Sequence, residues 1–572
     1  MKKWVIADRV DEDYMKTIAE EDDILAQIFF NRNITTEQEK NDFLNPEYEQ
    51  LRDPFLLKNM DIAVSRLVLA LKEKHRIVIF GDYDVDGCTA TAILYRALRS
   101  YGGSVSYYIP DRMKEGYGMT KVAIDHLIDR GTDLIITVDN GTASYDEVGY
   151  AKEHNIDVII TDHHEVTKEV PQALAVINPK QLDDPYPFEG ICGATVAFKL
   201  VCALTMRLGE KDDSIRLEQL KWYLDLVAIG TVADVMPLID ENRILVKYGL
   251  MVLKKTRNPG IKAIAKVAGI ELEKVDVRTI GFAFAPRINA AGRMTHAENA
   301  LKLLLTDNPA EAEMLALRLE QLNRQRQETV KSHIDNVKLE LYSRDKIDSV
   351  LVLHDASWTS GILGLIAGRV SEEFSRPVFC LAEEGGMFKG SARSSVDFHI
   401  VEAMKAVSET LVKFGGHKQA GGFTVTHDHY EIFKQSLISY GDLVLHDDNK
   451  VREIQVDAEI DTSRITKKLF RDLQKLQPFG QKNPDPVFAA HAMLVTETKL
   501  VGADLKHLKI TLKDSHNNTW KGIAFSVEDE IKEIERGERV DIAFSIQENE
   551  WKGVTNLECM IHDIRRSKQE TT

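Results

Sequence analysis

Short apolar runs, separated by segments of helical pattern, recur in the first half of the chain. Four of them are Ile77–Phe80, Leu134–Val138, Val158–Ile160 and Ala175–Ile177. Uninterrupted apolar runs of this length are typical of strands buried on both faces, which occur in parallel sheets joined by crossover helices. The pattern therefore predicts an α/β domain, whose binding crevice should lie beyond the carboxyl ends of the strands.

A long helix is predicted to follow this domain. Asn308 and Pro309 suit the cap and first turn of a helix, and the chain from there to about Tyr342 is rich in helix formers and lacks glycine. New apolar runs at Ser349–Leu353 and Pro377–Leu381 then restart an α/β pattern. The helix is therefore predicted to connect two α/β lobes.

The C-terminal region alternates short strands with turns. The strands are expected at His507–Leu512, Thr519–Phe525, Val540–Ile546 and Leu557–Ile561. About five short strands in such a region fit a small barrel of the OB type, which frequently binds single-stranded nucleic acid.

The length of 572 residues exceeds what one hydrophobic core supports, since single cores stop growing near ~250–300 residues. We expect five parts: a small N-terminal cap (1–50), the parallel-sheet domain (51–305), the connecting helix (306–343), the smaller α/β domain (344–445) and the OB-type barrel (446–572).

Composition limits the classes of protein that remain. The five scattered cysteines contain no CxxC and predict neither a disulfide framework nor a zinc site. The N-terminus meets charge after four apolar residues, and no later run reaches the ~18 apolar residues of a membrane span. A soluble cytoplasmic protein is expected.

The net charge of −17 argues against a nucleic-acid partner. The argument is weak, because carboxylates that hold metal ions present a neutralised site to the substrate.

Three aspartates, Asp82, Asp84 and Asp86, follow the first strand at alternate positions. Their spacing matches the start of an EF-hand calcium loop, but Ile93 stands where that loop needs a bidentate glutamate, and a strand precedes the motif in place of a helix. A helix cap would require only one aspartate. Three close carboxylates repel one another unless a divalent cation compensates them, so the motif predicts a metal site.

Acids or histidines end three more apolar segments: Asp139, the triplet Asp162–His164, and Asp234. Each is weak evidence alone, since a turn aspartate or a solvated histidine pair is common. Four such segments at one edge of a sheet would form an oxygen-rich ligand set with imidazole, which suits Mn²⁺ or Mg²⁺ better than zinc or copper.

These four segments, in this order, resemble the DHH phosphoesterases, a family named for the triplet Asp162-His163-His164. Further segments resemble the single-strand-specific nucleases within that family: Pro286–Arg293, Gly390–Ser394, Gly415–Gly422, Gln477–Gly480 and Asn483-Pro484. The resemblance covers about residues 50–565. It implies an α/β fold with a DHH parallel-sheet domain, a long connecting helix, a DHH-associated substrate-binding domain and a C-terminal OB-type barrel.

The resemblance also implies two divalent ions, Mn²⁺ or Mg²⁺, held by Asp84, Asp86, Asp139, His163 and Asp234. Asp84 and Asp139 would hold one ion. Asp86, His163, Asp234 and Asp139 would hold the second ion, so that Asp139 bridges the two ions.

Two further residues are expected to act in catalysis, His164 by facing the scissile phosphate and Asp82 as a ligand or a supporting group. The role of Asp82 stays open, because the first family motif often has a histidine upstream of the paired acids, where this chain has Phe80 and Asp82.

Seven residues are candidates for binding phosphate: Arg287, Asn289, Arg293, Ser391, Arg393, His417 and Lys418. Guanidinium groups pair with phosphate in a bidentate manner, and the glycines of 415–422 allow backbone N–H groups to approach an anion closely. The alternative for the glycine-rich segment is a tight structural turn.

The resemblance implies an exonuclease specific for single-stranded DNA that acts 5′ to 3′ and releases 5′-mononucleotides in recombination and repair. It also implies single-strand binding protein and a RecQ-type helicase as partners, and no membrane. One alternative is a phosphodiesterase for short RNA or cyclic dinucleotides, which would not need residues 451–566. Another is a non-catalytic DNA-binding scaffold, which typically loses metal ligands.

Overall fold

The computed structural model describes residues 2–20, 22–166, 169–210, 212, 214–445, 453–502, 505–525, 527, 529–551 and 554–567. The chain forms two compact units. The larger comprises Gln50–Met236 and Asp240–Lys450, and the smaller comprises Met1–Glu49, Pro237–Ile239 and Val451–Thr572. Within the described stretches, no helix has the length and apolar character needed to cross a bilayer.

The first lobe of the larger unit contains a five-stranded sheet in the order β3-β2-β4-β5-β6, with all neighbours parallel. The strands are β2 (Arg76–Phe80), β3 (Ser104–Tyr108), β4 (Leu134–Val138), β5 (Asp157–Thr161) and β6 (Ala175–Ile177). The four strands predicted from apolar runs are confirmed. The edge strand β3 was not predicted, because Ser104 and Ser106 are exposed and interrupt its apolar pattern.

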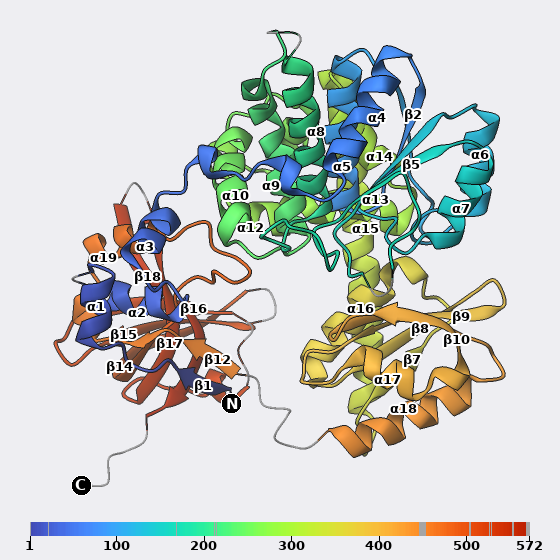
Figure 1. Ribbon diagram of the computed structural model, residues 1–572. Coiled ribbons are helices and arrows are strands. Elements are labelled where there is room, and N and C mark those ends of the chain that lie inside the picture. The colour runs from blue at the N-terminus through green and yellow to red at the C-terminus, as the bar shows by residue number, and fades with distance from the viewer. Residues whose placement is uncertain are drawn as a thin grey trace. The chain divides into compact units, whose positions relative to one another are not determined.

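Helices cover both faces of this sheet (Figure 1). One face carries α6 (Lys121–Asp129) and α7 (Tyr145–Glu153), whose apolar side chains join those of the strands in a buried core. The opposite face is covered by α4 (Met60–Lys72), α5 (Val85–Ser100) and α8 (Gly193–Gly209). This arrangement leaves the loops at the carboxyl ends of the strands as the site for chemistry.

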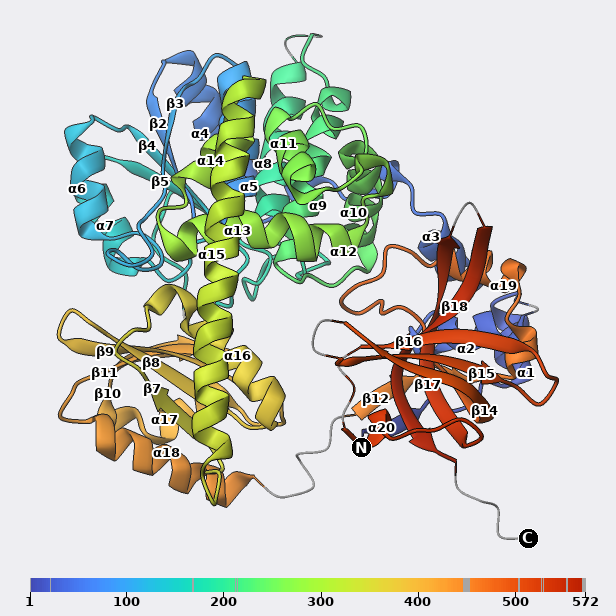
Figure 2. The same cartoon turned by 180° about the vertical axis from the view of Figure 1, so that it is seen from behind.

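Further helices complete the first lobe. They are α9 (Leu224–Ala233), α10 (Asp240–Leu253), α11 (Pro259–Ala268), α12 (Val277–Thr279), the π-helical turn η5 (Ile280–Phe284), α13 (Ala285–Met294) and α14 (Glu298–Leu305). The 34-residue helix α15 (Pro309–Tyr342) follows, and its cap Asn308 accepts a hydrogen bond from the backbone of Ala310. Figure 2 shows α15 extending from the first lobe along the second, which confirms the predicted connecting helix.

The second lobe is built on a mixed sheet in the order β10-β11-β9-β8-β7, in which only β7 and β8 are parallel. The strands are β7 (Leu351–His354), β8 (Val378–Glu384), β9 (Met387–Arg393), β10 (Leu411–Gly416) and β11 (Ala420–Val425). Its helices are α16 (Ser360–Phe374), α17 (Ile400–Ala406) and α18 (Tyr430–Val444). The lobe is therefore the expected smaller α/β domain.

The smaller unit contains a closed barrel. Its strands are β13 (Ala458–Glu459), β14 (Phe488–Val501), β15 (His507–Lys513), β16 (Thr519–Ala524), β17 (Arg539–Trp551) and β18 (Val554–Arg566). Pairing of β14 with β17 closes a ring of five strands, β14-β15-β16-β18-β17. The helix α19 (Lys467–Gln474) and a short parallel pair, β1 (Lys3–Ile6) with β12 (Glu453–Val456), belong to the same unit.

The N-terminal segment, which the sequence sets apart as a small cap, shares its core with this barrel. It contains α1 (Glu12–Thr17), α2 (Asp23–Asn31) and α3 (Glu37–Leu44), the last beginning with a capping box at Thr36. Ile28 and Phe29 of α2 are fully buried in one cluster with Phe488 and Phe544 of the barrel. The segment therefore completes the hydrophobic core of the C-terminal unit.

A core substitution tests this shared packing. Phe29→Ala is expected to destabilise the smaller unit by about 3–5 kcal/mol, the usual cost of removing a buried phenylalanine side chain. Amide hydrogen exchange of β15 and β17 should accelerate, whereas the exposed neighbour Phe30 should tolerate alanine with little change. Faster exchange confined to α1–α3 would contradict the shared core.

Candidate active site

Acidic and histidine side chains gather at the carboxyl edge of the first sheet. Asp82, Asp84 and Asp86 follow β2, Asp139 follows β4, and the triplet Asp162–His164 follows β5. Asp234 joins them from the C-terminal end of α9. Asp86, Asp139 and His163 are at most 5% exposed. The structure thus brings together all seven residues that the sequence predicted as metal ligands or catalytic groups.

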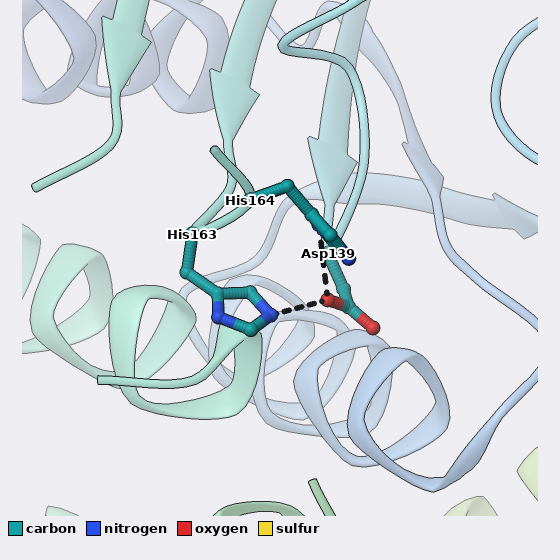
Figure 3. Close-up of side chains that lie close together, drawn as sticks. All are labelled: Asp139, His163 and His164. Atoms are coloured by element: carbon teal, nitrogen blue, oxygen red, sulfur yellow. Dashed lines mark hydrogen bonds and ion pairs between the residues drawn. The ribbon is translucent and has the colours of Figure 1, made fainter. Parts of the chain in front are cut away.

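The potential ligands form two adjacent groups, and a third group of Asp139, His163 and His164 shares one residue with each of them. Asp82, Asp84 and Asp139 each present an oxygen within 4.8 Å of the others, and Asp86, His163 and Asp234 form a second set of the same size. Figure 3 shows the His163 ring pointing at the carboxylate of Asp139, with Nε2 3.0 Å from Oδ1. Asp139 therefore lies between the two groups, as expected for a bridging ligand.

Local backbone structure sets the positions of these carboxylates. Asp84 caps α5 by accepting a hydrogen bond of 3.0 Å from the Gly87 N–H. Asp139 leaves β4 in the left-handed region, with φ +62°, a conformation that aspartate tolerates better than most residues. The buried Asn140 side chain donates to the carbonyls of Phe80 and Val138 and so ties the ends of β2 and β4 together.

The first turn of α8 holds Asp86. Its carboxylate accepts hydrogen bonds from the backbone N–H groups of Gly193 at 2.6 Å and Ala194 at 2.9 Å, and the N-terminus of a helix favours negative charge. A Cβ atom at Gly193 would lie 2.7 Å from the Cβ of Asp139, and one at Gly230 would lie 2.7 Å from Oδ1 of Asp86. Both glycines therefore permit close approach of the backbone to the ligands.

Electrostatics show that the cluster is suited to a cation. Burial first, and then repulsion among the carboxylates, raises the pKa of Asp86 to about 6 and that of Asp234 to about 8. The same causes raise the pKa of Asp82 and Asp139 well above the ordinary range. Burial lowers the pKa of His163 to about 3, so its imidazole is neutral and able to ligate a metal.

Unsatisfied polar atoms support the same conclusion. Within the described part of the chain, Asp82 Oδ1, Asp234 Oδ2 and His163 Nδ1 are buried without a hydrogen-bond partner. Buried groups of this kind are costly unless they are paired or coordinate a metal. The residues present thus fit divalent cations, which would neutralise the carboxylates and provide partners for their oxygens.

These pKa shifts predict a pH-dependent effect of metal on stability. A carboxyl whose pKa is raised by folding stabilises the protein at low pH, and this contribution is lost as pH rises through the folded-state value. The metal-free protein should therefore lose stability up to about pH 8. Bound Mn²⁺ should offset that loss, adding about 2.7 kcal/mol at 100 times its Kd. Thermal unfolding in Mn²⁺ and in EDTA should show a larger metal-induced gain at pH 8 than at pH 5.5, and an equal gain would contradict the assignment.

Asp162 orients the second histidine of the triplet. Its Oδ1 lies 2.7 Å from Nδ1 of His164 and accepts the backbone N–H of His163, while Oδ2 accepts the Thr142 N–H. Burial by itself lowers the pKa of His164, but the hydrogen bond and charge of Asp162 raise it to about 9. His164 is therefore cationic at neutral pH, and its side chain is 41% exposed. No role for Asp162 was predicted from the sequence.

Several predicted phosphate ligands belong to a cluster of arginines. Arg293 donates to the Gly361 carbonyl at 3.1 Å, and Arg393 donates to Ser391 Oγ at 3.2 Å. Burial first, and then the positive charges of Arg112 and Arg326, lowers the pKa of Arg293 to about 9. Neighbouring guanidinium groups of this kind are suited to an anion.

Arg112 and Arg326 were missed by sequence reasoning, because neither lies in a recognisable motif. Arg112 packs over the ring of Tyr83 at 4.7 Å from its centroid. Arg326, on α15, donates to Asn323, while its Nε is buried and without a partner among the described residues.

The other predicted phosphate ligands do not belong to this cluster of arginines. Arg287 pairs with Glu320 of α15 at 2.7 Å, and the exposed Lys418 pairs with Asp397 at 2.8 Å. Asn289 lies on α13 and is partly exposed. Their roles in phosphate binding remain predictions.

His417 lies in the turn between β10 and β11, whose glycines pair across the hairpin as Gly415 with Gly422 and Gly416 with Gly421. The glycine-rich segment thus forms a β-hairpin, and its role in phosphate binding remains a prediction. Lys180 and, more weakly, His417 lower the pKa of Glu165, which follows the histidine pair. His417 therefore lies near Glu165, the residue that follows the histidine pair.

Three family models match the chain. They are the DHH family N-terminal domain over residues 76–231, the DHHA1 domain over 348–440 and the RecJ OB domain over 456–563. A crystal structure of RecJ from Thermus thermophilus in complex with Mn²⁺ superimposes with a TM-score of 0.84 at 30% identity, covering 99% of this chain and 80% of that chain.

Two curated relatives are named single-stranded-DNA-specific exonuclease RecJ. The protein from Escherichia coli is 36% identical over 89% of this chain and 90% of its own length. The protein from Bacillus subtilis is 35% identical over 99% of this chain and 71% of its own length. These matches, which together cover nearly the whole chain, show that it belongs to the RecJ family of DHH phosphoesterases.

Proposed function

We propose that this protein is a metal-dependent exonuclease that hydrolyses single-stranded DNA from the 5′ end, releases 5′-mononucleotides and acts in recombination and repair. The observation that carries the proposal is the pair of ligand groups that meet at Asp139. Every residue of the expected ligand set is present, so the chain does not have the incomplete site of a non-catalytic scaffold. The family relatives support single-stranded DNA as the substrate.

Two divalent ions, Mn²⁺ or Mg²⁺, would be held by Asp84, Asp86, Asp139, His163 and Asp234, with Asp82 as a further ligand or support. When bound, they supply a nucleophilic hydroxide at neutral pH and neutralise charge on the phosphate. Asp86 is preoriented for this role by the N-terminal turn of α8. Neutral His163 would contribute an imidazole nitrogen, and its Nε2 lies 3.0 Å from Oδ1 of Asp139.

His164 would stabilise charge on the reacting phosphate. Asp162 binds its Nδ1 and keeps the imidazole protonated, so the side chain can donate a hydrogen bond to a phosphate oxygen as negative charge increases. The arginine cluster formed by Arg112, Arg293, Arg326 and Arg393 would hold a second phosphate of the same strand. Contacts with two phosphates of the strand would position one phosphodiester bond beside the metal-ligand groups for hydrolysis.

The barrel would also bind single-stranded DNA. The outward face of β15 carries Lys509, and Lys499 of β14 is directly opposite it. Like charges in register destabilise a sheet, so this pair favours a polyanionic ligand. Phe525 is 54% exposed next to His507 and would offer a ring for base stacking.

The test is digestion of matched 5′-labelled and 3′-labelled single-stranded DNA in Mn²⁺ and in EDTA, with duplex DNA and short RNA alongside. We expect the 5′-labelled strand to release labelled mononucleotides early in the reaction. This release should be absent in EDTA and with duplex DNA. Early release from the 3′ label would refute the polarity. Turnover of short RNA without DNA cleavage would identify an oligonucleotide phosphodiesterase.

The resemblance of the motifs to the family also supports a cytoplasmic protein that works with single-strand binding protein and a RecQ-type helicase. Co-purification of either protein with the intact chain, retained after nuclease treatment, tests the partners directly.

A further inference from the structure

Tyr117 contacts two key residues of the site through one hydroxyl group. Its Oη donates to the backbone carbonyl of Asp139 at 2.8 Å and lies 3.1 Å from Nδ1 of His164. The rings of Tyr117 and His164 also meet edge to face, with centroids 5.6 Å apart. The phenol therefore joins the residue between the two ligand groups to the histidine expected to face phosphate.

Both contacts occur where the structure needs support. Asp139 has φ +62°, in the left-handed region that non-glycine residues adopt only rarely. The hydrogen bond to its carbonyl helps to hold this conformation. At His164, Nδ1 donates to the carboxylate of Asp162 at 2.7 Å, and the phenol oxygen is a second acceptor for the same N–H. The hydroxyl thus limits rotation of the imidazole.

The loop between β3 and α6 is constructed to present this side chain. Gly116 and Gly118 flank Tyr117 with φ +84° and +83°, values that L-amino acids other than glycine rarely adopt. Glu115 accepts the Asp111 N–H at 2.8 Å and the Tyr108 hydroxyl at 2.7 Å, which anchors the loop to β3.

The second lobe also contacts this loop. Lys389 of β9 donates to the Met113 carbonyl at 3.2 Å, four residues before Tyr117. Tyr117 itself remains 49% exposed, so filling a hydrophobic core does not explain the ring. The hydroxyl is the part of the side chain that the surrounding structure engages most directly.

We propose that Tyr117 is a positioning residue, whose hydroxyl fixes the backbone of Asp139 and the imidazole of His164 relative to each other. This inference rests on the proposed hydrolysis at the same site. A phenol is protonated at neutral pH, so the hydroxyl can donate to the Asp139 carbonyl while its oxygen accepts from His164.

A double-mutant cycle of Tyr117→Phe with His164→Ala tests the coupling. Removing the hydroxyl is expected to lower kcat about tenfold with KM unchanged, the size expected for losing a hydrogen bond that orients a catalytic group. At saturating Mn²⁺, which offsets weaker ion binding through Asp139, the same change in the His164→Ala background should cost less than about twofold, because neighbouring groups that act together are non-additive. Tyr150→Phe is the matched control, since that hydroxyl donates to Asp125 on the surface.

A second readout does not depend on turnover. Mn²⁺ titration of Tyr117→Phe should give a Kd about tenfold weaker than that of the unmodified protein, the usual range for loss of a group that orients a ligand. Equal losses of kcat in both backgrounds, or an unchanged Mn²⁺ Kd, would overturn the positioning role. Failure of the unmodified protein to cleave single-stranded DNA would instead overturn the proposed function, and the titration would still test Tyr117.

Discussion

Asp139→Asn is expected to lower hydrolysis of single-stranded DNA by on the order of 10³-fold or more, since a single lost electrostatic stabiliser already costs ~10²–10³. Asp139 contributes oxygens beside both ligand groups, so its loss should weaken both ion sites at once. Asparagine keeps the size of the side chain and tolerates the left-handed backbone of this position. The loss can therefore be assigned to the carboxylate.

Single-turnover cleavage and Mn²⁺ titration are the measurements for this variant. The matched control is Asp129→Asn, an exposed aspartate at the end of α6, which should cleave at the unmodified rate. Near-normal cleavage by Asp139→Asn, with a folded protein by circular dichroism, would exclude a bridging role for Asp139.

The two histidines of the triplet should respond differently to alanine. His164→Ala is expected to lower kcat by about 10²–10⁴-fold, the range for loss of a positioned acid or base, with little change in Mn²⁺ affinity. His164 is oriented by Asp162 and is protonated, so its contribution should be to the reacting phosphate. His163→Ala should weaken Mn²⁺ binding, because neutral His163 contacts Asp139 and lies 3.6 Å from Asp234.

Mn²⁺ titration and single-turnover rates at saturating Mn²⁺ separate these effects. His154→Ala is a suitable control, since this exposed histidine caps the C-terminus of α7. A large loss of Mn²⁺ affinity in His164→Ala, or normal affinity in His163→Ala, would reverse the two assignments.

The position of the cluster of acidic and histidine side chains was predictable from the sequence for a clear physical reason. Strands buried on both faces form continuous apolar runs, and their carboxyl ends meet at one edge of a parallel sheet. Aspartates after β2 and β4 and the triplet after β5 therefore had to lie close together. Asp234 was harder to place, because its apolar segment is the helix α9 and reaches the edge from a different direction.

Contacts between distant segments could not be predicted in this way. The N–H groups that hold Asp86 come from Gly193 and Ala194, more than 100 residues later in the chain. Arg326 joins the arginine cluster from α15. None of these residues has a local pattern that distinguishes a site residue from an ordinary helix position.

The sequence by itself determined the metal chemistry and the order of the elements, since ligand type and hydrophobic periodicity are local properties. Only the tertiary structure decided which side chains support that chemistry. The apolar sequence of α2 indicates that this helix must be buried, but the sequence does not indicate that it packs against the C-terminal barrel. Likewise, Tyr117 reaches Asp139 and His164 because packing of the whole sheet brings three separate loops to one edge.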